Sequence, residues 1–191
     1  RVLCRFINDG AFHLRAEWGR SFTRRPAYGA SRVVPFRSKL VQTNGTIRLR
    51  AGDRELVIRT QPLVITLFSG SEPVFQTIAD PVRLQIVEEQ VFRNDTFHRR
   101  LSATTNMECL LAGGARYFGL GGKTGALELA GRSFEFWNSD TYKYKRDTDP
   151  IYTSIPVYHA LNGARSHAVF TECPSRGWIR FGKEIRFTVD S

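Results

Sequence analysis

Hydrophobic and polar residues alternate with a period of two along most of this chain. Ile47, Leu49 and Ala51 alternate with polar residues, "AGD" supplies a turn, and Leu56 and Ile58 resume the alternation. Because successive side chains of a β-strand point to opposite faces, this pattern predicts a hairpin with one buried face.

Further runs of this kind occur along the rest of the chain. They are "PLVITLF", "VRLQIV", "RSFEFWN", "SIPVY", "SHAVFTE", "GWIRFG" and "EIRFTVD", and the last two predict a second hairpin. No segment keeps the i, i+3, i+4, i+7 spacing of an amphipathic helix, and "VEEQVF" predicts at most one or two helical turns. Many short strands and almost no helix predict an all-β fold, an antiparallel β-sandwich or barrel.

The composition is that of a globular protein with a sizeable core. The chain has 191 residues, of which 41% are hydrophobic, and no repeat or linker divides it, so we expect a single domain over residues 1–191. No apolar run approaches the roughly 20 residues of a membrane-spanning helix, and no membrane partner is expected. Arg1 and Ser191 look like the ends of a piece cut from a longer chain. The sequence does not determine the cellular compartment.

The positive charge of the chain is large but scattered. Lys and Arg outnumber Asp and Glu by 28 to 18, a net charge of +10 that would favour polyanions. However, the cations stand as single residues at alternating positions, as in "TIRLR", which is typical of the solvent-facing side of strands. We therefore favour exposed strand residues over a nucleic-acid partner, and keep nucleic-acid binding as the alternative.

Histidines and cysteines are not spaced as metal ligands. The cysteines lack a C-x-x-C pair, so we expect reduced, buried thiols, and the histidines lack H-E-x-x-H spacing. We expect neither a metal site nor a cofactor. The residues concerned are Cys4, Cys109, Cys173, His13, His98, His159 and His167.

The glycine-rich stretch "RYFGLGGKTG" (116–125) suggests either a phosphate cradle or a turn. A P-loop needs glycine five residues before the Gly122-Lys123 pair, and Tyr117 stands there. The G-x-G-x-x-G pattern fails because Thr124 occupies its third glycine position. Both motifs also require a following helix, whereas "RSFEFWN" alternates like a strand, so tight turns and close backbone approach explain the glycines better.

The segment "EFWNSDTYKYKRDTDPIYTSIPVY" combines carboxylates, an amide and aromatic rings in one loop. Asp accepts hydrogen bonds from vicinal hydroxyls and rings pack on C–H faces, which suits a hydroxyl-rich ligand. The alternative is that Asn138 and Asp140 cap a turn and that Trp137 belongs to the core. The carboxylates that could pair for glycoside chemistry are Glu128, Glu135, Asp140, Asp147 and Asp149, the last two in the stretch "KRDTDP", expected to be a solvated loop.

Residues 116–158 closely resemble the N-terminal β-sandwich domain of glycoside hydrolase family 31, the α-glucosidase and α-xylosidase group. The resemblance lies in a Tyr/Phe-Gly-Leu-Gly turn, a Trp-Asn-x-Asp loop and a Tyr-x-Ser-Ile-Pro strand, in that order. The stretches "ARSHAVFTECPSRGWIRFGK" and "RELVIRTQPLVITLFSGSEPVF" are similar to the family's next and preceding blocks. The resemblance implies a galactose-mutarotase-like supersandwich packed on a catalytic (β/α)₈ barrel, C-terminal to this chain and absent from it.

The resemblance also implies roles for particular residues. The family's barrel supplies an Asp nucleophile and an Asp acid/base for a retaining mechanism, so no catalytic residue is expected here. Asp140 falls on the loop residue that helps form the aglycone-side subsite for an α-linked oligosaccharide in some members, with Tyr142 and Asn138 beside it. Gly122 replaces the usual Glu, which implies a looser turn, and Lys123 is a possible partner of Asp140.

Taken together, these observations favour the non-catalytic N-terminal domain of a retaining α-glycoside hydrolase. Whether the chain itself is an enzyme stays open, because the catalytic carboxylates would lie outside it. The alternatives are a stand-alone carbohydrate- or nucleic-acid-binding β-sandwich module, and a purely structural domain in which Asp140 caps a turn. The sugar is not determined, because the barrel would decide it.

Overall fold

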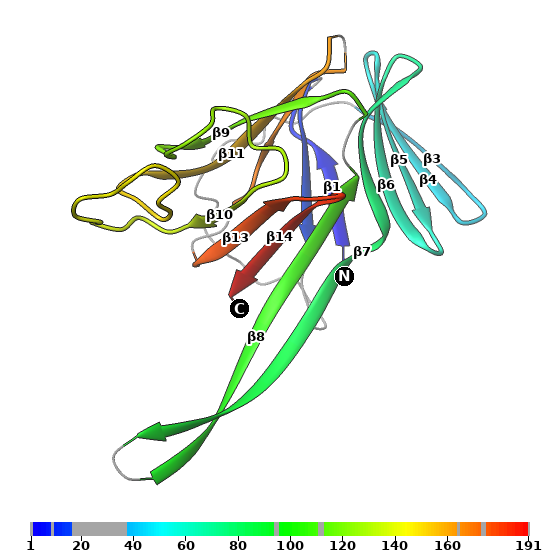
Figure 1. Ribbon diagram of the computed structural model, residues 1–191. Coiled ribbons are helices and arrows are strands. Elements are labelled where there is room, and N and C mark those ends of the chain that lie inside the picture. Colours follow the sequence, from blue (N-terminus) through cyan, green and yellow to red (C-terminus); the bar gives the residue numbers. More distant parts are fainter. Residues whose placement is uncertain are drawn as a thin grey trace. The chain divides into compact units, whose positions relative to one another are not determined.

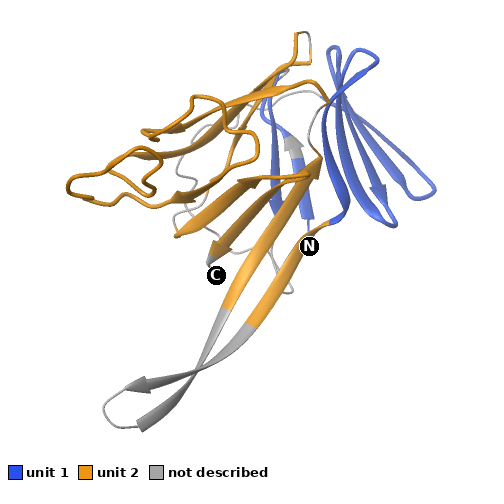
Figure 2. Ribbon diagram, in the orientation of Figure 1, with its two compact units in different colours: residues 1–80 blue, residues 81–191 orange. Residues whose placement is uncertain are grey.

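The computed structural model describes residues 2–8, 10–16, 38–93, 96–110, 113–163, 165–172 and 175–190. All helical or extended structure in these residues is β-strand, and every strand pair with a described register is antiparallel. The chain forms two compact units, residues 1–80 and 81–191 (Figure 2). The prediction of an all-β antiparallel fold is confirmed, whereas that of a single domain stays a prediction.

The first unit contains a hairpin and a meander of strands. Each strand of the meander pairs with the next, and in the predicted hairpin Ile47 faces Ile58 and Leu49 faces Leu56. Leu56, Ile65 and neighbouring apolar side chains are buried. The strands are β1 (Val2–Phe6), β2 (Phe12–Ala16), β3 (Lys39–Thr43), β4 (Thr46–Ala51), β5 (Arg54–Thr60), β6 (Leu63–Ser69) and the start of β7 (Glu72–Arg93).

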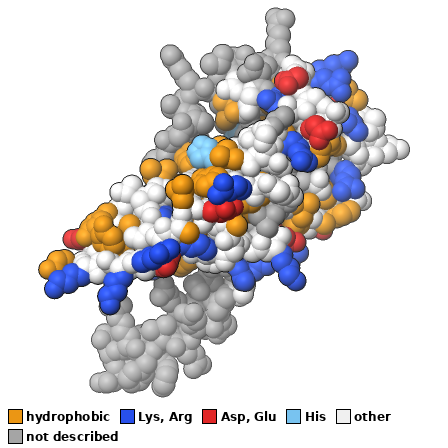
Figure 3. Space-filling view, turned by 45° about the horizontal axis from the view of Figure 1, so that its top comes forward, with side chains coloured by type: hydrophobic (Ala, Val, Ile, Leu, Met, Phe, Trp, Pro, Cys, Tyr) orange, Lys and Arg blue, Asp and Glu red, His pale blue; other side chains and the backbone are white. Residues whose placement is uncertain are grey.

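The arginines of β4 face solvent, as their alternating positions predict. Arg48 and Arg50 are exposed and both make ion pairs with Glu55 on β5, each with a nitrogen–oxygen distance of 3.1 Å. On the face that Figure 3 shows, Lys and Arg side chains are scattered among hydrophobic and neutral ones and form no single patch. This face, with Arg48 and Arg50, therefore agrees with the interpretation of the charge as exposed strand residues.

The second unit contains two sheets (Figure 1). One has the order β10–β13–β14–β8 and continues to β7, and the other has the order β12–β11–β9. The predicted final hairpin is present as β13 and β14, which pair in register. The strands are β8 (Thr96–Leu110), β9 (Arg116–Gly121), β10 (Ser133–Phe136), β11 (Ser154–Leu161), β12 (His167–Phe170), β13 (Gly177–Phe181) and β14 (Glu184–Asp190).

Aromatic rings from both sheets form the core of the second unit. Tyr117 on β9 and Tyr158 on β11 pack against Phe181 on β13, with ring centroids 5.4 and 5.5 Å apart, and Tyr158 stacks on Phe187 at 6.0 Å. These four side chains alternate with exposed or half-buried neighbours, because the period of a strand is two. Tight contacts between the two sheets define this unit as a β-sandwich.

No helical turn forms in the segment 87–92, "VEEQVF", for which the sequence allows at most one or two. Its backbone lies within β7. The segment is preceded by the alternating run "VRLQIV", and extended pairing in a sheet outweighs the weak local helix preference of its two glutamates. No helix in the described residues is long and apolar enough to cross a membrane.

The glycine-rich stretch lies on β9 and continues into the connection to β10. β9 pairs with β11, not with β10, so the stretch is not a two-strand hairpin. At Gly119 the backbone has φ of 123°, and an added Cβ would lie 2.5 Å from the Val157 carbonyl oxygen. Close backbone approach therefore requires glycine here, as the sequence predicts.

Candidate functional site

The candidate site is the loop 137–153, which connects β10 to β11 and extends from the second unit at the left of Figure 1. It contains Asn138, Asp140 and Tyr142, the three residues that the sequence suggests for substrate binding. The loop contains no strand, so side-chain hydrogen bonds hold its backbone in place of a ladder. These bonds fall into a base, where the loop leaves and rejoins the sheets, and an exposed outer part.

An ion pair between Lys123 and Asp149 lies at the base of the loop. The Lys123 side chain is only 5% exposed and that of Asp149 17%, and their Nζ–Oδ1 distance is 2.6 Å. Lys123 Nζ also donates to the Glu135 carbonyl oxygen at 2.7 Å, and the Glu135 N–H donates to Asp149 Oδ2 at 2.5 Å. Lys123 and Asp149 thus satisfy both backbone groups of one β10 residue.

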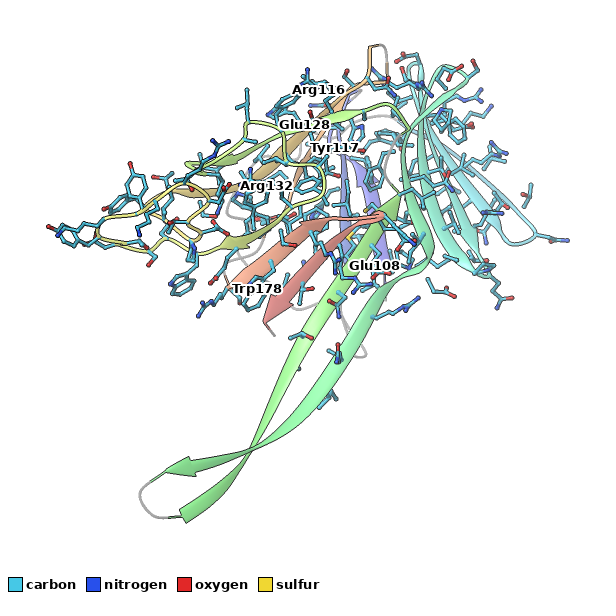
Figure 4. The ribbon with its side chains drawn as sticks, in the orientation of Figure 1. Glu108, Arg116, Tyr117, Glu128, Arg132 and Trp178 are labelled. Carbon is cyan, nitrogen blue, oxygen red and sulfur yellow. The ribbon has the colours of Figure 1, made fainter. Side chains whose placement is uncertain are left out.

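A second set of bonds joins the same two segments. Thr124 Oγ1 donates to the Thr148 carbonyl oxygen at 2.9 Å, and Arg132 makes an ion pair with Asp147 at 2.7 Å. The Arg132 guanidinium also donates to the carbonyl oxygens of Thr124 and Ala126 (Figure 4 labels Arg132). The stretch "KTGA" that follows the glycines is therefore bonded side by side to "DTD" of the loop.

Gly125 lies between these groups in a backbone conformation that favours glycine. Gly125 has φ of 96°, and an added Cβ would lie 2.0 Å from Asp147 Oδ1 and 2.7 Å from the Arg132 guanidinium. A larger residue would both strain the backbone and push the ion pair apart. The glycine-rich stretch therefore serves the loop, not a phosphate.

Asn138 and Thr141 hold the outer part of the loop to its own return strand. Asn138 Oδ1 accepts a hydrogen bond from the Ser154 N–H at 2.7 Å, so this residue fastens a turn. Thr141 Oγ1 donates to the Pro150 carbonyl oxygen at 2.9 Å, and Tyr152 Oη donates to the Thr141 carbonyl oxygen at 3.1 Å. The outer part of the loop is thus cross-linked on both sides of Asp140.

Asp140 differs from the other carboxylates that the sequence suggests. Within the described part of the chain, Glu128, Glu135, Asp147 and Asp149 make ion pairs with Arg116, Arg176, Arg132 and Lys123, respectively. Figure 4 shows the pair Arg116–Glu128 beside β9. Asp140 is exposed and makes no such pair or hydrogen bond with any residue that the structure describes. Its carboxylate oxygens are therefore free to accept hydrogen bonds from a ligand.

Aromatic rings are exposed on and beside the loop. Tyr142 is 80% exposed and Trp137 48%, so the alternative that Trp137 belongs to the core is wrong. The Arg176 guanidinium lies 5.9 Å from the Trp137 ring centroid and 5.7 Å from that of Trp178. Tyr144 packs edge-on against Tyr152, with centroids 6.0 Å apart. The loop thus presents flat apolar surfaces next to a carboxylate.

One further expectation about this loop is wrong and another holds in part. Lys123 does not pair with Asp140, because Asp149 and the Glu135 carbonyl oxygen hold its ammonium group. In the stretch 145–150, Lys145, Arg146 and Asp147 are exposed as expected, whereas Asp149 is mostly buried in that pair. Sequence reasoning also missed Arg132 and Arg176, whose partners lie 15 and 41 residues away, and no local motif marks such pairs.

Burial also shifts the pKa of titratable groups away from the loop. Burial raises the pKa of the Cys4 thiol to about 11 and that of Cys109 to about 12, so both free thiols stay protonated near neutral pH. Burial also raises the pKa of Tyr158 well above its usual value, and its hydroxyl lacks a hydrogen-bond partner among the described residues. Among the described residues, no group of three or more His, Cys, Asp or Glu side chains could hold a metal ion. Cys173, the third cysteine, lies outside the described residues.

The fold and the loop define an antiparallel β-sandwich domain with a polar, aromatic loop at one sheet end. Residues 1–179 match the family of glycosyl hydrolase 31 N-terminal galactose mutarotase-like domains, and the chain belongs to this family. This match confirms the predicted galactose-mutarotase-like sandwich fold. It also confirms the family resemblance that the glycine turn and the Trp-Asn-x-Asp loop indicated.

Individual relatives agree with the family match. The chain is 34% identical over 55 residues to "Alpha-glucosidase 2" of Bacillus thermoamyloliquefaciens, covering 28% of this chain and 7% of that protein. It is similar in structure to a GH31 dextranase of Flavobacterium johnsoniae complexed with glucose, with a TM-score of 0.78 at 16% identity over 98% of this chain and 22% of the other.

A GH31 α-xylosidase of Xanthomonas citri is also similar, with a TM-score of 0.69 at 14% identity over 93% of this chain and 17% of that enzyme. At these identities the structural matches show the fold alone. The chain spans only about a fifth of the length of these solved enzymes.

Proposed function

We propose that this chain is the non-catalytic N-terminal domain of a retaining α-glycoside hydrolase, and that loop 137–153 contributes to the aglycone-side sugar subsite. In this proposal the catalytic carboxylates lie on a (β/α)₈ barrel that follows the chain and packs against it. Membership of the glycosyl hydrolase 31 N-terminal domain family supports the first part. The single observation that supports the second is the exposed, unpaired carboxylate of Asp140 on a loop whose other acids are in ion pairs.

Each proposed residue has a distinct role toward an α-linked oligosaccharide. Asp140 accepts hydrogen bonds from neighbouring sugar hydroxyls, since an ionised carboxylate is purely an acceptor. The exposed ring of Tyr142 packs on the C–H face of the sugar. Asn138 Oδ1 accepts a hydrogen bond from the Ser154 N–H, and its amide N–H groups remain to donate to the substrate.

Substitution of Asp140 in the full-length enzyme tests this proposal. Asp140→Asn keeps the shape of the side chain but removes the charge that strengthens its hydrogen bonds. We expect kcat/KM for an oligosaccharide to fall by an amount equivalent to about 1–3 kcal/mol of transition-state binding, with folding intact. Steady-state kinetics on a disaccharide and a trisaccharide measure the effect.

The matched control is Glu72→Gln, which removes an exposed carboxylate from the first unit. We expect this variant to leave kcat/KM on both sugars at the unsubstituted value. Unaltered kinetics of Asp140→Asn on both sugars would overturn the role of the loop. Family membership would stand, since it rests on the sequence match.

A further inference from the structure

The base of loop 137–153 coincides with the free edge of a sheet. β10 is the last strand of its sheet and pairs only with β13 among the described strands. On its other edge the N–H and carbonyl groups of Glu135 point away from β13 and bond to Asp149 and Lys123. The two side chains thus take the place of a neighbouring strand and cover an otherwise open edge.

The burial of this ion pair shows that its geometry is specific. A buried ammonium is costly unless charged and polar partners surround it, and Lys123 has the Asp149 carboxylate and the Glu135 carbonyl within 2.7 Å. Well-packed apolar residues can stabilise a protein as much as such a pair does. We therefore expect the pair to fix one particular backbone arrangement more than it adds to overall stability.

Two short connections lead from this pair to Asp140. Pro150 and Ile151 directly follow Asp149, and their carbonyl oxygens accept hydrogen bonds from Thr141 Oγ1 at 2.9 Å and from the Ser139 N–H at 3.3 Å. Ser139 and Thr141 are the two neighbours of Asp140. A shift of Asp149 is therefore expected to move the backbone on both sides of Asp140.

We propose that Lys123 and Asp149 are positioning residues, which cover the β10 edge and thereby place Asp140 for substrate binding. The inference rests on the proposed function of the loop. It also makes a claim of its own, that breaking the pair releases the loop while the sandwich stays folded. Lys123, the lysine of the glycine-rich stretch, thus binds the carboxylate of Asp149, 26 residues further along the chain.

The experiment compares variants of the full-length enzyme that contains this chain. Lys123→Met removes the ammonium at nearly constant length, and Asp149→Asn keeps the shape of the carboxylate without its charge. Arg116→Met is the matched control, because it removes the exposed ion pair with Glu128 in the same unit. Asp140→Ala serves as the reference for a direct loss of the binding group.

The first readout is limited trypsin digestion, followed by mass spectrometry of the loop fragments. Lys143, Lys145 and Arg146 are exposed trypsin sites on the outer part of the loop. We expect Lys123→Met and Asp149→Asn to speed cleavage at these sites about tenfold or more, because cleavage follows the open population of a segment. Arg116→Met is expected to cleave there at the unsubstituted rate.

The second readout separates positioning from a loss of folded enzyme. We expect both variants to raise KM for a trisaccharide by about tenfold, with a much smaller rise for an aryl glycoside that lacks the aglycone sugar. Partial unfolding would instead lower kcat for the two substrates equally and leave KM as it is. If Lys123→Met does not fold, Asp149→Asn provides the same comparison.

The outcomes distinguish the two proposals. Faster loop cleavage with an increased trisaccharide KM supports the inference. If Asp140→Ala changes the kinetics but Lys123→Met and Asp149→Asn change neither cleavage nor KM, the inference is overturned and the subsite proposal stands. If the pair variants speed cleavage while they and Asp140→Ala all leave the kinetics unaltered, the pair holds the loop and the subsite proposal fails.

Discussion

The aromatic core of the second unit and loop 137–153 are stabilised by different interactions. The core is built from fully buried rings and aliphatic side chains such as Ile179, and the rings of Tyr158 and Phe181 touch across the two sheets. The loop is held by ion pairs and by hydrogen bonds from side chains to backbone, around Lys123 and Asp149. One region depends on buried apolar area and the other on the geometry of a few polar atoms.

The two regions are therefore expected to respond differently to substitution. Removing a buried ring leaves a cavity, which lowers the free energy of unfolding of the whole sandwich. Removing one hydrogen bond of the loop frees a few residues while the core stays packed, because local segments can open well below the global free energy of unfolding. Residues of the loop can therefore be substituted while the sandwich stays folded.

The largest effect is expected from a core substitution. Phe181 is fully buried against Tyr117 and Tyr158, so Phe181→Ala loses both buried area and packing contacts. We expect its free energy of unfolding to fall by about 3–5 kcal/mol, measured by urea denaturation. Phe170→Ala, at a half-exposed position on β12, is the control and is expected to cost far less. Equal losses in the two variants would contradict the assignment of the core.

A smaller effect is expected in the loop. Thr141→Val keeps the size of the side chain but removes the hydroxyl that donates to the Pro150 carbonyl oxygen. We expect a cost of about 0.5–1.5 kcal/mol that appears as faster hydrogen exchange of loop amides. Thr141→Ser retains the hydroxyl, so its loop amides are expected to exchange as slowly as those of the unsubstituted protein. Faster exchange throughout the core strands of Thr141→Val would show that loop and core are not separable.

The smallest effect is expected from a histidine at the border of the core. Partial burial beside the Tyr158 ring lowers the pKa of His167, while a contact with the Arg165 carbonyl oxygen opposes this shift. Below pH 6.5, the ordinary pKa of histidine, the unfolded chain binds a proton before the folded chain does. The free energy of unfolding therefore falls as the pH drops from about 7.5 to 5.

His167→Gln isolates this contribution, because glutamine does not titrate. We expect the urea midpoint to fall less on acidification in the variant than in the unsubstituted protein. Parallel midpoints across the pH range would contradict a lowered pKa for this imidazole.

Much of the fold follows from local pattern. The alternation in "TIRLRAGDRELVIR" predicts β4, its turn and β5, because a buried face requires apolar residues at every second position. At "VEEQVF" the local helix preference of the glutamates is overridden by pairing within a sheet. For the candidate site, residue type and family resemblance predict the loop and the choice of Asp140. That Asp140 has no ion pair among the described residues follows only from the structure, because the sequence suggests Lys123 as its partner. Asn138 is then found fastening a turn, in agreement with the alternative role as a turn residue.

The all-β class, the two hairpins and the presence of close backbone approaches at the glycines can all be predicted from the sequence. These features depend on residues that are near one another along the chain or on the period of a strand. The pairing of Lys123 with Asp149 instead of Asp140, in contrast, is visible only in the folded chain. The reason is that an ion pair forms between whichever charges the folded backbone brings within about 4 Å, and at a separation of tens of residues no local pattern contains that information.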